Sequence, residues 1–164
     1  MQVFAVLTGI LTGDTAKNIM LRTLRDDTMA KCTVAMGYYL CRALEITGLY
    51  SHMDTVWELW REMIRNNMTT CVESPGETAR SDWLAWSALI LHELPAVTLG
   101  VQPAAPGYEV ICVNPVPGYL THAQGTVLTP RGEVKVSWRL KDGKLDCEVA
   151  APEGVKVIMP AVSK

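Results

Sequence analysis

The chain has 164 residues, of which 49% are hydrophobic and 20% are charged, and its formal net charge is −2. This composition is typical of a soluble globular protein with one domain or two small ones. The charge excludes the basic footprint of a nucleic-acid-binding protein or of one held on an anionic membrane surface. No apolar run reaches the roughly 18 residues that a membrane-spanning helix needs.

The first hundred residues are predicted to be helical. Their apolar residues recur at helical spacing, and short polar connections between the segments favour antiparallel neighbours. Gly48 stands where a helix C-cap glycine is expected, and Pro95 should kink or end the regular part of the last helix. The predicted helices span residues 3–11, 14–25, 30–47, 51–68 and 81–99.

The fourth of these segments carries the strongest helical signal. Ser51 and Asp54 have nearly the spacing and chemistry of a capping box. The apolar side chains that follow fall on one stripe, which we assign to the core: Met53, Val56, Trp57, Trp60, Met63 and Ile64.

After residue 100 the apolar period changes to two. Residues 101–107 are rich in Pro, Gly and Ala and are expected to form a linker. Val134, Val136 and Trp138 alternate with polar residues and should point inward, and Asp142-Gly143 predicts a two-residue hairpin. Strands are predicted at 108–113, 120–128, 134–139, 145–149 and 155–159. The fold class is therefore α+β with two units, a helical unit 1–100 and an antiparallel β-sandwich unit 101–164.

Neither cysteine nor histidine follows a metal-ligand pattern. The number of cysteines is odd, their spacings are wide, and no Cys-x-x-Cys pair occurs, which argues against a disulfide framework or a zinc site. We therefore expect no metal and no cofactor. The residues concerned are Cys32, Cys41, Cys71, Cys112, Cys147, His52, His92 and His122.

The stretch 69–86 is the strongest functional candidate, because loops between rigid elements concentrate binding and catalytic groups. Carboxylates beside indole rings suit sugar chemistry, since the carboxylate can act as an acid or base and the indole offers a flat apolar face. A polar loop leading into an amphipathic helix is the simpler interpretation of the same spacing. The polar and aromatic residues of interest are Glu73, Glu77, Arg80, Asp82 and Trp86.

Two motifs in this stretch resemble the late active-site segment of the inverting α-L-rhamnosidases. The first is Thr69-Thr70-x-x-Glu73-x-Pro75, and the second is Arg80-Ser81-Asp82-x-x-Ala85-Trp86. The resemblance continues downstream through 99–108, 125, 130–134 and 152–154. Each motif alone would be weak, whereas the two together are specific.

The resemblance implies a fold and a set of roles. The fold would be part of an (α/α)₆ barrel followed by a C-terminal β-sandwich. Glu73 stands at the position of the family's general base, and Asp82, Trp86, Arg80 and Glu77 are candidate substrate contacts. Helix capping by Asp82, core packing of Trp86, an ion pair for Arg80 and a solvated Glu77 remain alternatives.

The chain also departs from the family pattern. Relatives usually carry Cys-His-Ala-Trp after the Arg-Ser-Asp motif, whereas Leu84 replaces the sugar-contacting His here. Nothing before Thr69 resembles the family's general-acid motif. We therefore expect a fragment or relative of an α-L-rhamnosidase that is inactive alone.

A second function class remains open, which is a non-catalytic module that binds glycans or stabilises an assembly. The expected partner of the parent enzyme is a rhamnoside, with no nucleic acid and no membrane. An open arc of barrel helices would expose apolar surface, so a homodimer through the helical part is expected. The compartment is left open, with a soluble cytoplasmic protein favoured.

Overall fold

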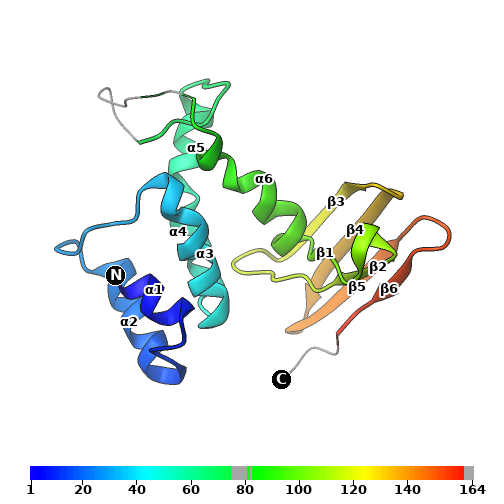
Figure 1. Ribbon diagram of the computed structural model, residues 1–164, viewed down its shortest axis with the longest axis horizontal. Helices are drawn as coiled ribbons and strands as arrows, with labels where there is room; N and C mark the ends of the chain where they lie inside the picture. The colour runs from blue at the N-terminus through cyan, green and yellow to red at the C-terminus, as the bar shows by residue number, and fades with distance from the viewer. Residues whose placement is uncertain (75–80, 82, 161–164) are drawn as a thin grey trace. The chain divides into compact units, whose positions relative to one another are not determined.

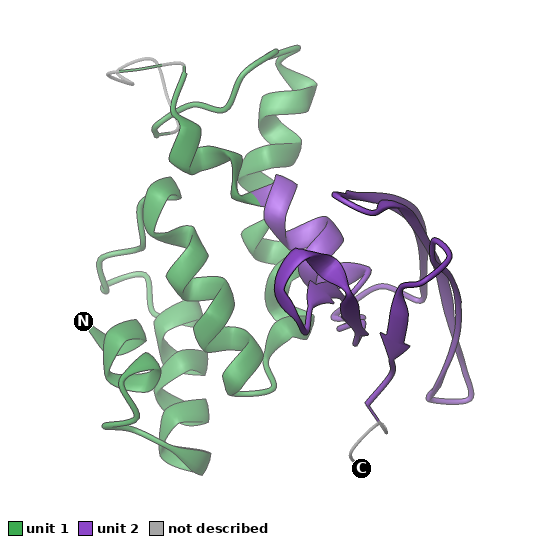
Figure 2. Cartoon of the chain, turned by 45° about the vertical axis from the view of Figure 1, so that its right-hand side comes forward, with its two compact units in different colours: residues 1–89 green, residues 90–164 purple. Residues whose placement is uncertain are grey.

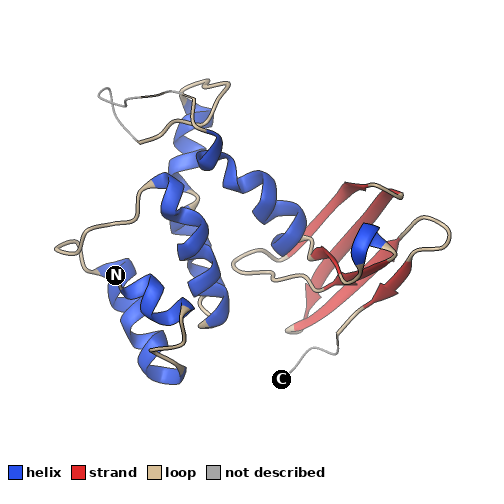
Figure 3. Ribbon diagram, in the orientation of Figure 1, coloured by secondary structure: helices blue, strands red, loops and turns tan. Residues whose placement is uncertain are grey.

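The computed structural model describes residues 1–74, 81 and 83–160 (Figure 1). The chain divides into two compact units, Met1–Leu89 and Ile90–Lys164, which Figure 2 colours separately. The first unit is helical, and the second contains the end of a helix and all the described strands (Figure 3).

Apart from the second one, which matches its predicted range to within a residue, the helices of the first unit are shorter than the sequence predicts. They are α1 (Gln2–Leu7), α2 (Gly13–Arg25), α3 (Gly37–Ile46), α4 (Met53–Val56) and α5 (Glu58–Arg65). Turns of 3₁₀-helix at Val34–Met36, Tyr50–His52 and Ala85–Leu89 accompany them.

The start predicted for the third helix, residue 30, lies several residues before the observed one. Helix α3 begins at Gly37, not near Ala30, because the preceding loop folds back on the end of α2. Asp26 accepts a bond from the backbone N–H of Thr28 at 3.0 Å, and the Lys31 ammonium donates to the Asp26 carbonyl at 3.0 Å. These local bonds compete with helical ones, which is why the loop does not continue the helix.

The end of α3 is predicted correctly. Gly48 adopts φ +68°, its N–H donates to the Glu45 carbonyl at 3.1 Å, and the Leu49 N–H donates to Leu44 at 2.7 Å. These two bonds form a Schellman motif, in which a residue with positive φ satisfies the last carbonyls of the helix.

The fourth predicted helix is divided into α4 and α5, which meet at Trp57. Ser51 does not cap it, because it lies inside the 3₁₀ turn Tyr50–His52 and no side-chain cap bond forms there. Trp57 and Trp60 are buried as predicted and pack edge to face with ring centroids 5.3 Å apart. Ile64 is 73% exposed, so the stripe ends at Met63 in the last turn of α5.

The fifth predicted helix begins as the 3₁₀ turn Ala85–Leu89, not at Ser81, and continues as α6 (Ile90–Glu93). A π-helical turn, Leu94–Thr98, follows and contains Pro95. Because proline lacks an N–H group, the regular bonding is interrupted there, and the Leu99 N–H donates to Leu94 at 2.9 Å, five residues back.

The second unit contains two three-stranded sheets. One has the order β1-β2-β6, with β1 (Val101–Pro103), β2 (Val110–Val113) and β6 (Lys156–Ile158). The other has the order β3-β4-β5, with β3 (His122–Thr129), β4 (Gly132–Lys141) and β5 (Lys144–Ala150), and is antiparallel throughout.

Two features of the first sheet differ from the prediction. Val101–Pro103 is strand β1 and not linker, because it pairs with Ile111–Val113. Strand β6 runs parallel to β2, so this sheet is not wholly antiparallel. The parallel pair arises because β6 follows a crossover from the other sheet and not a hairpin.

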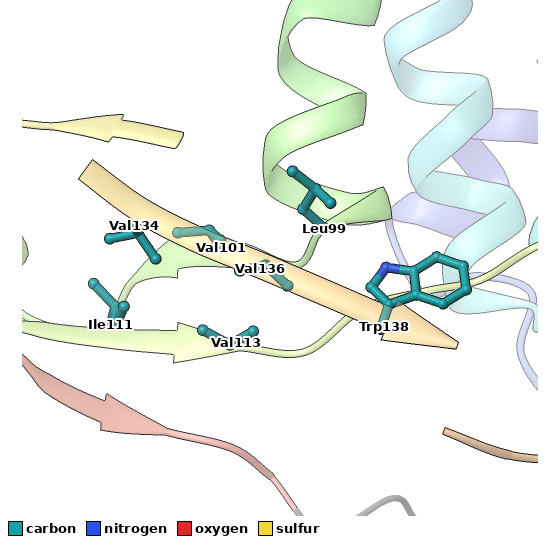
Figure 4. Close-up of a cluster of buried hydrophobic side chains, with 7 residues drawn as sticks. All are labelled: Leu99, Val101, Ile111, Val113, Val134, Val136 and Trp138. Atoms are coloured by element: carbon teal, nitrogen blue, oxygen red, sulfur yellow. The ribbon is translucent and has the colours of Figure 1, made fainter. Parts of the chain in front are cut away.

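One core joins the two sheets. Val134, Val136 and Trp138 of β4 are buried and alternate with exposed Lys135, Ser137 and Arg139, as predicted. The predicted hairpin is also confirmed, since Lys141 pairs with Lys144 around Asp142 (φ +49°) and Gly143 (φ +73°). Figure 4 shows the shared cluster, which consists of Leu99, Val101, Ile111, Val113, Val134, Val136 and Trp138.

Candidate functional site

Two backbone hydrogen bonds bring the two halves of the candidate motif together. The N–H of Glu73 donates to the carbonyl oxygen of Ser81 at 2.9 Å, and the N–H of Leu84 donates to Cys71 at 2.8 Å. Glu73 therefore lies beside Ser81, and Cys71 lies beside Leu84. Glu73 itself is partly buried, and Val72 next to it is buried in the helical unit.

Three of the candidate contact residues lie outside the described part of the chain. They are Glu77, Arg80 and Asp82. Their neighbours Ser81 and Trp83 form a local turn, in which the Ser81 hydroxyl accepts from the Trp83 N–H at 3.1 Å and donates to the Trp83 carbonyl at 2.8 Å. This turn leads directly into the helical segment that carries Trp86.

Trp86 does not belong to the core. Its side chain is 74% exposed, and that of Trp83 is 81% exposed, so the core-packing alternative for Trp86 is wrong for this chain. The adjacent Ser87 is completely buried. The segment therefore exposes the Trp86 ring, whereas the next residue, Ser87, is buried in the helical unit.

The anchor of this segment is Trp60, a residue that the sequence identifies only as core. Its indole N–H donates to the Ser87 carbonyl oxygen at 2.8 Å. Trp60 thus fixes the turn that positions Trp86. Its place in the apolar stripe gave no indication of this second task, because the partner lies 27 residues away in the sequence.

Leu84 lies inside the second motif and is hydrogen-bonded to the first. Its N–H is bonded to Cys71, two residues before Glu73, and its side chain is partly buried. The side chain of a leucine here contributes apolar surface and cannot form a hydrogen bond. A side chain with a ring nitrogen at this position would add a polar group near Glu73.

Within the described residues, no group of three His, Cys, Asp or Glu side chains is placed to hold a metal ion. No helix among those described is long and apolar enough to cross a membrane. The chemical groups that the described part of the candidate site offers are therefore a carboxylate, hydroxyls and exposed indoles. Such a set suits a neutral, hydroxylated ligand.

The β unit matches a known domain family. The family model described as the bacterial alpha-L-rhamnosidase C-terminal domain covers residues 100–161. This range begins just before β1 and ends after β6, so it includes both sheets.

Longer similarities extend into the helical unit. An alpha-L-rhamnosidase of Formosa agariphila is 31% identical over 99 residues, which cover 60% of this chain and 10% of that protein. The crystal structure of a GH78 family rhamnosidase of Bacillus sp. GL1 has 29% sequence identity and a TM-score of 0.79, covering 97% of this chain and 18% of that one.

A more distant structure shares the fold. The alpha-L-rhamnosidase from Dictyoglumus thermophilum has a TM-score of 0.76 at 17% identity, covering 99% of this chain and 20% of that one. The chain thus spans between a tenth and a fifth of the length of these relatives. By its domain match and its relatives, the chain resembles the C-terminal part of the bacterial-type α-L-rhamnosidases, and residues 100–161 correspond to the C-terminal domain of that family.

Proposed function

We propose that this chain supplies the base side of the active site and the C-terminal domain of an α-L-rhamnosidase. The reaction would release terminal α-L-rhamnose from a glycoside with inversion. The observation that carries the proposal is the hydrogen bond from the Glu73 N–H to Ser81, which brings the two motif halves together. The helical unit would then form part of an (α/α)₆ barrel.

The proposed role of Glu73 is to take a proton from the attacking water. An inverting glycosidase uses one carboxylate as this base and a second carboxyl group, across the sugar, to protonate the leaving oxygen. Neither step needs a metal or a cofactor. The second carboxyl group would come from outside this chain, because nothing before Thr69 resembles the acid motif.

The remaining candidates would hold the sugar. Trp86, with its exposed ring, would stack on an apolar sugar face. Arg80, Asp82 and Glu77 would bond to sugar hydroxyls. Leu84 stands where the family's histidine would make a further contact, so sugar binding by this chain should be weak.

A non-catalytic module that binds glycans or stabilises an assembly is the second candidate function. Leu84 beside the Glu73 segment favours it, because the side chain of leucine cannot donate or accept a hydrogen bond to a sugar. In that case the chain would retain a sugar-facing surface without turning substrate over. A homodimer through the helical unit fits either function.

Sugar binding can be tested by titrating the ¹⁵N-labelled chain with methyl α-L-rhamnopyranoside and following the indole N–H signals by NMR. The Trp86→Ala variant should bind about three- to tenfold more weakly, as expected for loss of one ring contact. Trp83→Ala is the matched control, because that ring is also exposed but stands at a position of the motif where relatives carry no tryptophan.

The Leu84→His variant tests the same site in the opposite direction. Restoring a ring nitrogen should tighten binding by about two- to tenfold, the value of one hydrogen bond. Equal weakening by Trp83→Ala and Trp86→Ala, together with no gain in Leu84→His, would contradict the assignment of this surface to rhamnose.

A further inference from the structure

The helical unit contains a pocket that the rhamnosidase proposal does not use. It lies between α2, the loop after α2, α3, α4 and α5, and its volume is about 350 Å³. Ligand pockets of this size accommodate small organic molecules. The pocket is lined largely by apolar side chains, which are Leu24, Val34, Leu40, Val56, Leu59 and Trp60.

The loop that forms one wall of this pocket is tied down. The Lys31 ammonium donates to the carbonyl oxygens of Asp26 at 3.0 Å and Leu24 at 3.3 Å, both at the end of α2. Asp26 in turn accepts hydrogen bonds from the Thr28 N–H and the Arg22 guanidinium. The wall is therefore part of the folded unit, and the pocket is preformed.

The charged groups at the rim are already paired. Lys31 lies 3.4 Å from the Asp27 carboxylate, besides its bonds to the backbone. The Thr23 hydroxyl is also engaged, since it donates to the Ile19 carbonyl at 2.7 Å. No unpaired charge therefore faces the pocket from these groups, which favours an uncharged ligand.

Two hydroxyl groups on the lining remain available to a ligand. Thr33 and Thr55 both border the pocket, and neither side chain has a hydrogen-bond partner among the described residues. Trp60 contributes an indole ring, on which a flat aromatic ring packs better than a branched aliphatic group. The lining thus combines an aromatic wall with a few hydrogen-bonding groups.

We propose that this pocket is a binding site for a small, neutral, phenol-like molecule. The ring would pack against Trp60, and the ligand hydroxyl would bond to Thr33 or Thr55. Because the Trp60 N–H donates to the Ser87 carbonyl, ligand binding in the pocket would also affect the segment that carries Trp86. The proposal stands independently of the rhamnosidase function.

The direct test is an NMR titration of the ¹⁵N-labelled chain with p-cresol, read at the Trp60 indole N–H. A ligand of so few atoms should bind with a dissociation constant of about a millimolar. 4-Methylcyclohexanol, which has a similar size and a hydroxyl group but no aromatic ring, serves as the comparison. No saturable shift with p-cresol, or an equal response to 4-methylcyclohexanol at this signal, would overturn the proposal.

Two variants locate the ligand. Val56→Trp fills the pocket and should weaken binding by at least about tenfold, because the bulky ring takes the ligand's space. Ile64→Trp adds the same ring on the neighbouring helix at a site that is 73% exposed, and should bind p-cresol as the unaltered chain does.

Thr55→Val keeps the shape of the side chain and removes its hydroxyl, so it remains informative if Val56→Trp does not fold. Either this variant or the equivalent Thr33→Val should weaken binding about two- to tenfold, as expected for one lost hydrogen bond. Unchanged affinity in a folded Val56→Trp variant, or in Thr55→Val and Thr33→Val together, would place the ligand elsewhere.

Discussion

The indole Nε1 of Trp138 donates a hydrogen bond to the backbone carbonyl oxygen of Thr98 over 2.8 Å. Trp138 lies on the central strand β4, and Thr98 ends the π-helical turn that precedes β1. Both residues are buried. The bond therefore fastens the helical entry of the second unit to its sheets, and it satisfies a carbonyl group that water cannot reach.

Replacing Trp138 by Phe should destabilise the second unit by about 2–4 kcal/mol, because the change removes this donor and leaves unfilled volume in the core. Urea unfolding of the variant measures the loss. Trp83→Phe is the control, since its side chain is 81% exposed and its substitution should change stability by less than about 0.5 kcal/mol. Equal urea midpoints for Trp138→Phe and Trp83→Phe would contradict the stabilising role assigned to Trp138.

Gly100 and Gly143 illustrate two different reasons why a position requires glycine, namely close packing against backbone and a left-handed backbone conformation. Both have positive φ, +77° and +73°, but a Cβ on Gly100 would lie 2.3 Å from backbone atoms of Asn114 and Pro115, whereas nothing lies within 4 Å of one on Gly143. Gly143→Ala should cost about 1–2 kcal/mol for the left-handed backbone alone. Gly100→Ala should cost clearly more, because backbone must move, and thermal unfolding of the two variants compares them directly. Equal losses would contradict the close approach.

The sequence predicts the second unit well because its signals are local. Alternation along β4 and the Asp142-Gly143 turn each determine which face is buried or where the chain reverses within a few residues. Strand β1 and the parallel pairing of β6 with β2 depend on partners distant in the chain, so composition alone suggested a linker and an antiparallel sheet.

The helical unit is predicted less well for a similar reason. Helical periodicity continues across Trp57, but the helix is broken there, and the loop after α2 prefers its own hydrogen bonds over helix. For the candidate site, the motif predicts which residues bind or react, and those roles stay predictions. The juxtaposition of Glu73 with Ser81 and the anchoring of Ser87 by Trp60 could not be inferred from the sequence, since each bond joins residues on opposite sides of a loop.

The chain alone should not hydrolyse p-nitrophenyl α-L-rhamnoside. On the proposed function it supplies the base Glu73 without the acid, and general acid assistance alone is worth about 10²–10⁴-fold in rate. Release of p-nitrophenol over hours should match the buffer blank. Turnover well above that blank, lost in Glu73→Gln and kept in the matched loop variant Glu153→Gln, would overturn this prediction.

The helical unit should mediate self-association. Phe4, Tyr38 and Tyr39 form an exposed aromatic group, in which the Tyr39 ring lies 5.1 Å from that of Phe4 and 5.5 Å from that of Tyr38. Each of these side chains is about 40% exposed. Burying apolar area contributes roughly 25 cal/mol per Å², and identical chains most simply close such a surface by a two-fold contact.

Light scattering coupled to size exclusion should therefore give a mass of at least twice the 18.0 kDa of one chain at micromolar concentration. Tyr39→Glu places a charge in the aromatic group and should shift the protein toward the monomer, because a buried, unpaired carboxylate is costly. Tyr119→Glu is the matched control, since Tyr119 in the second unit is also 39% exposed and its substitution should leave the dimer intact. A monodisperse 18.0 kDa species for the unaltered chain would rule out the dimer, and dissociation by Tyr119→Glu instead would move the interface to the second unit.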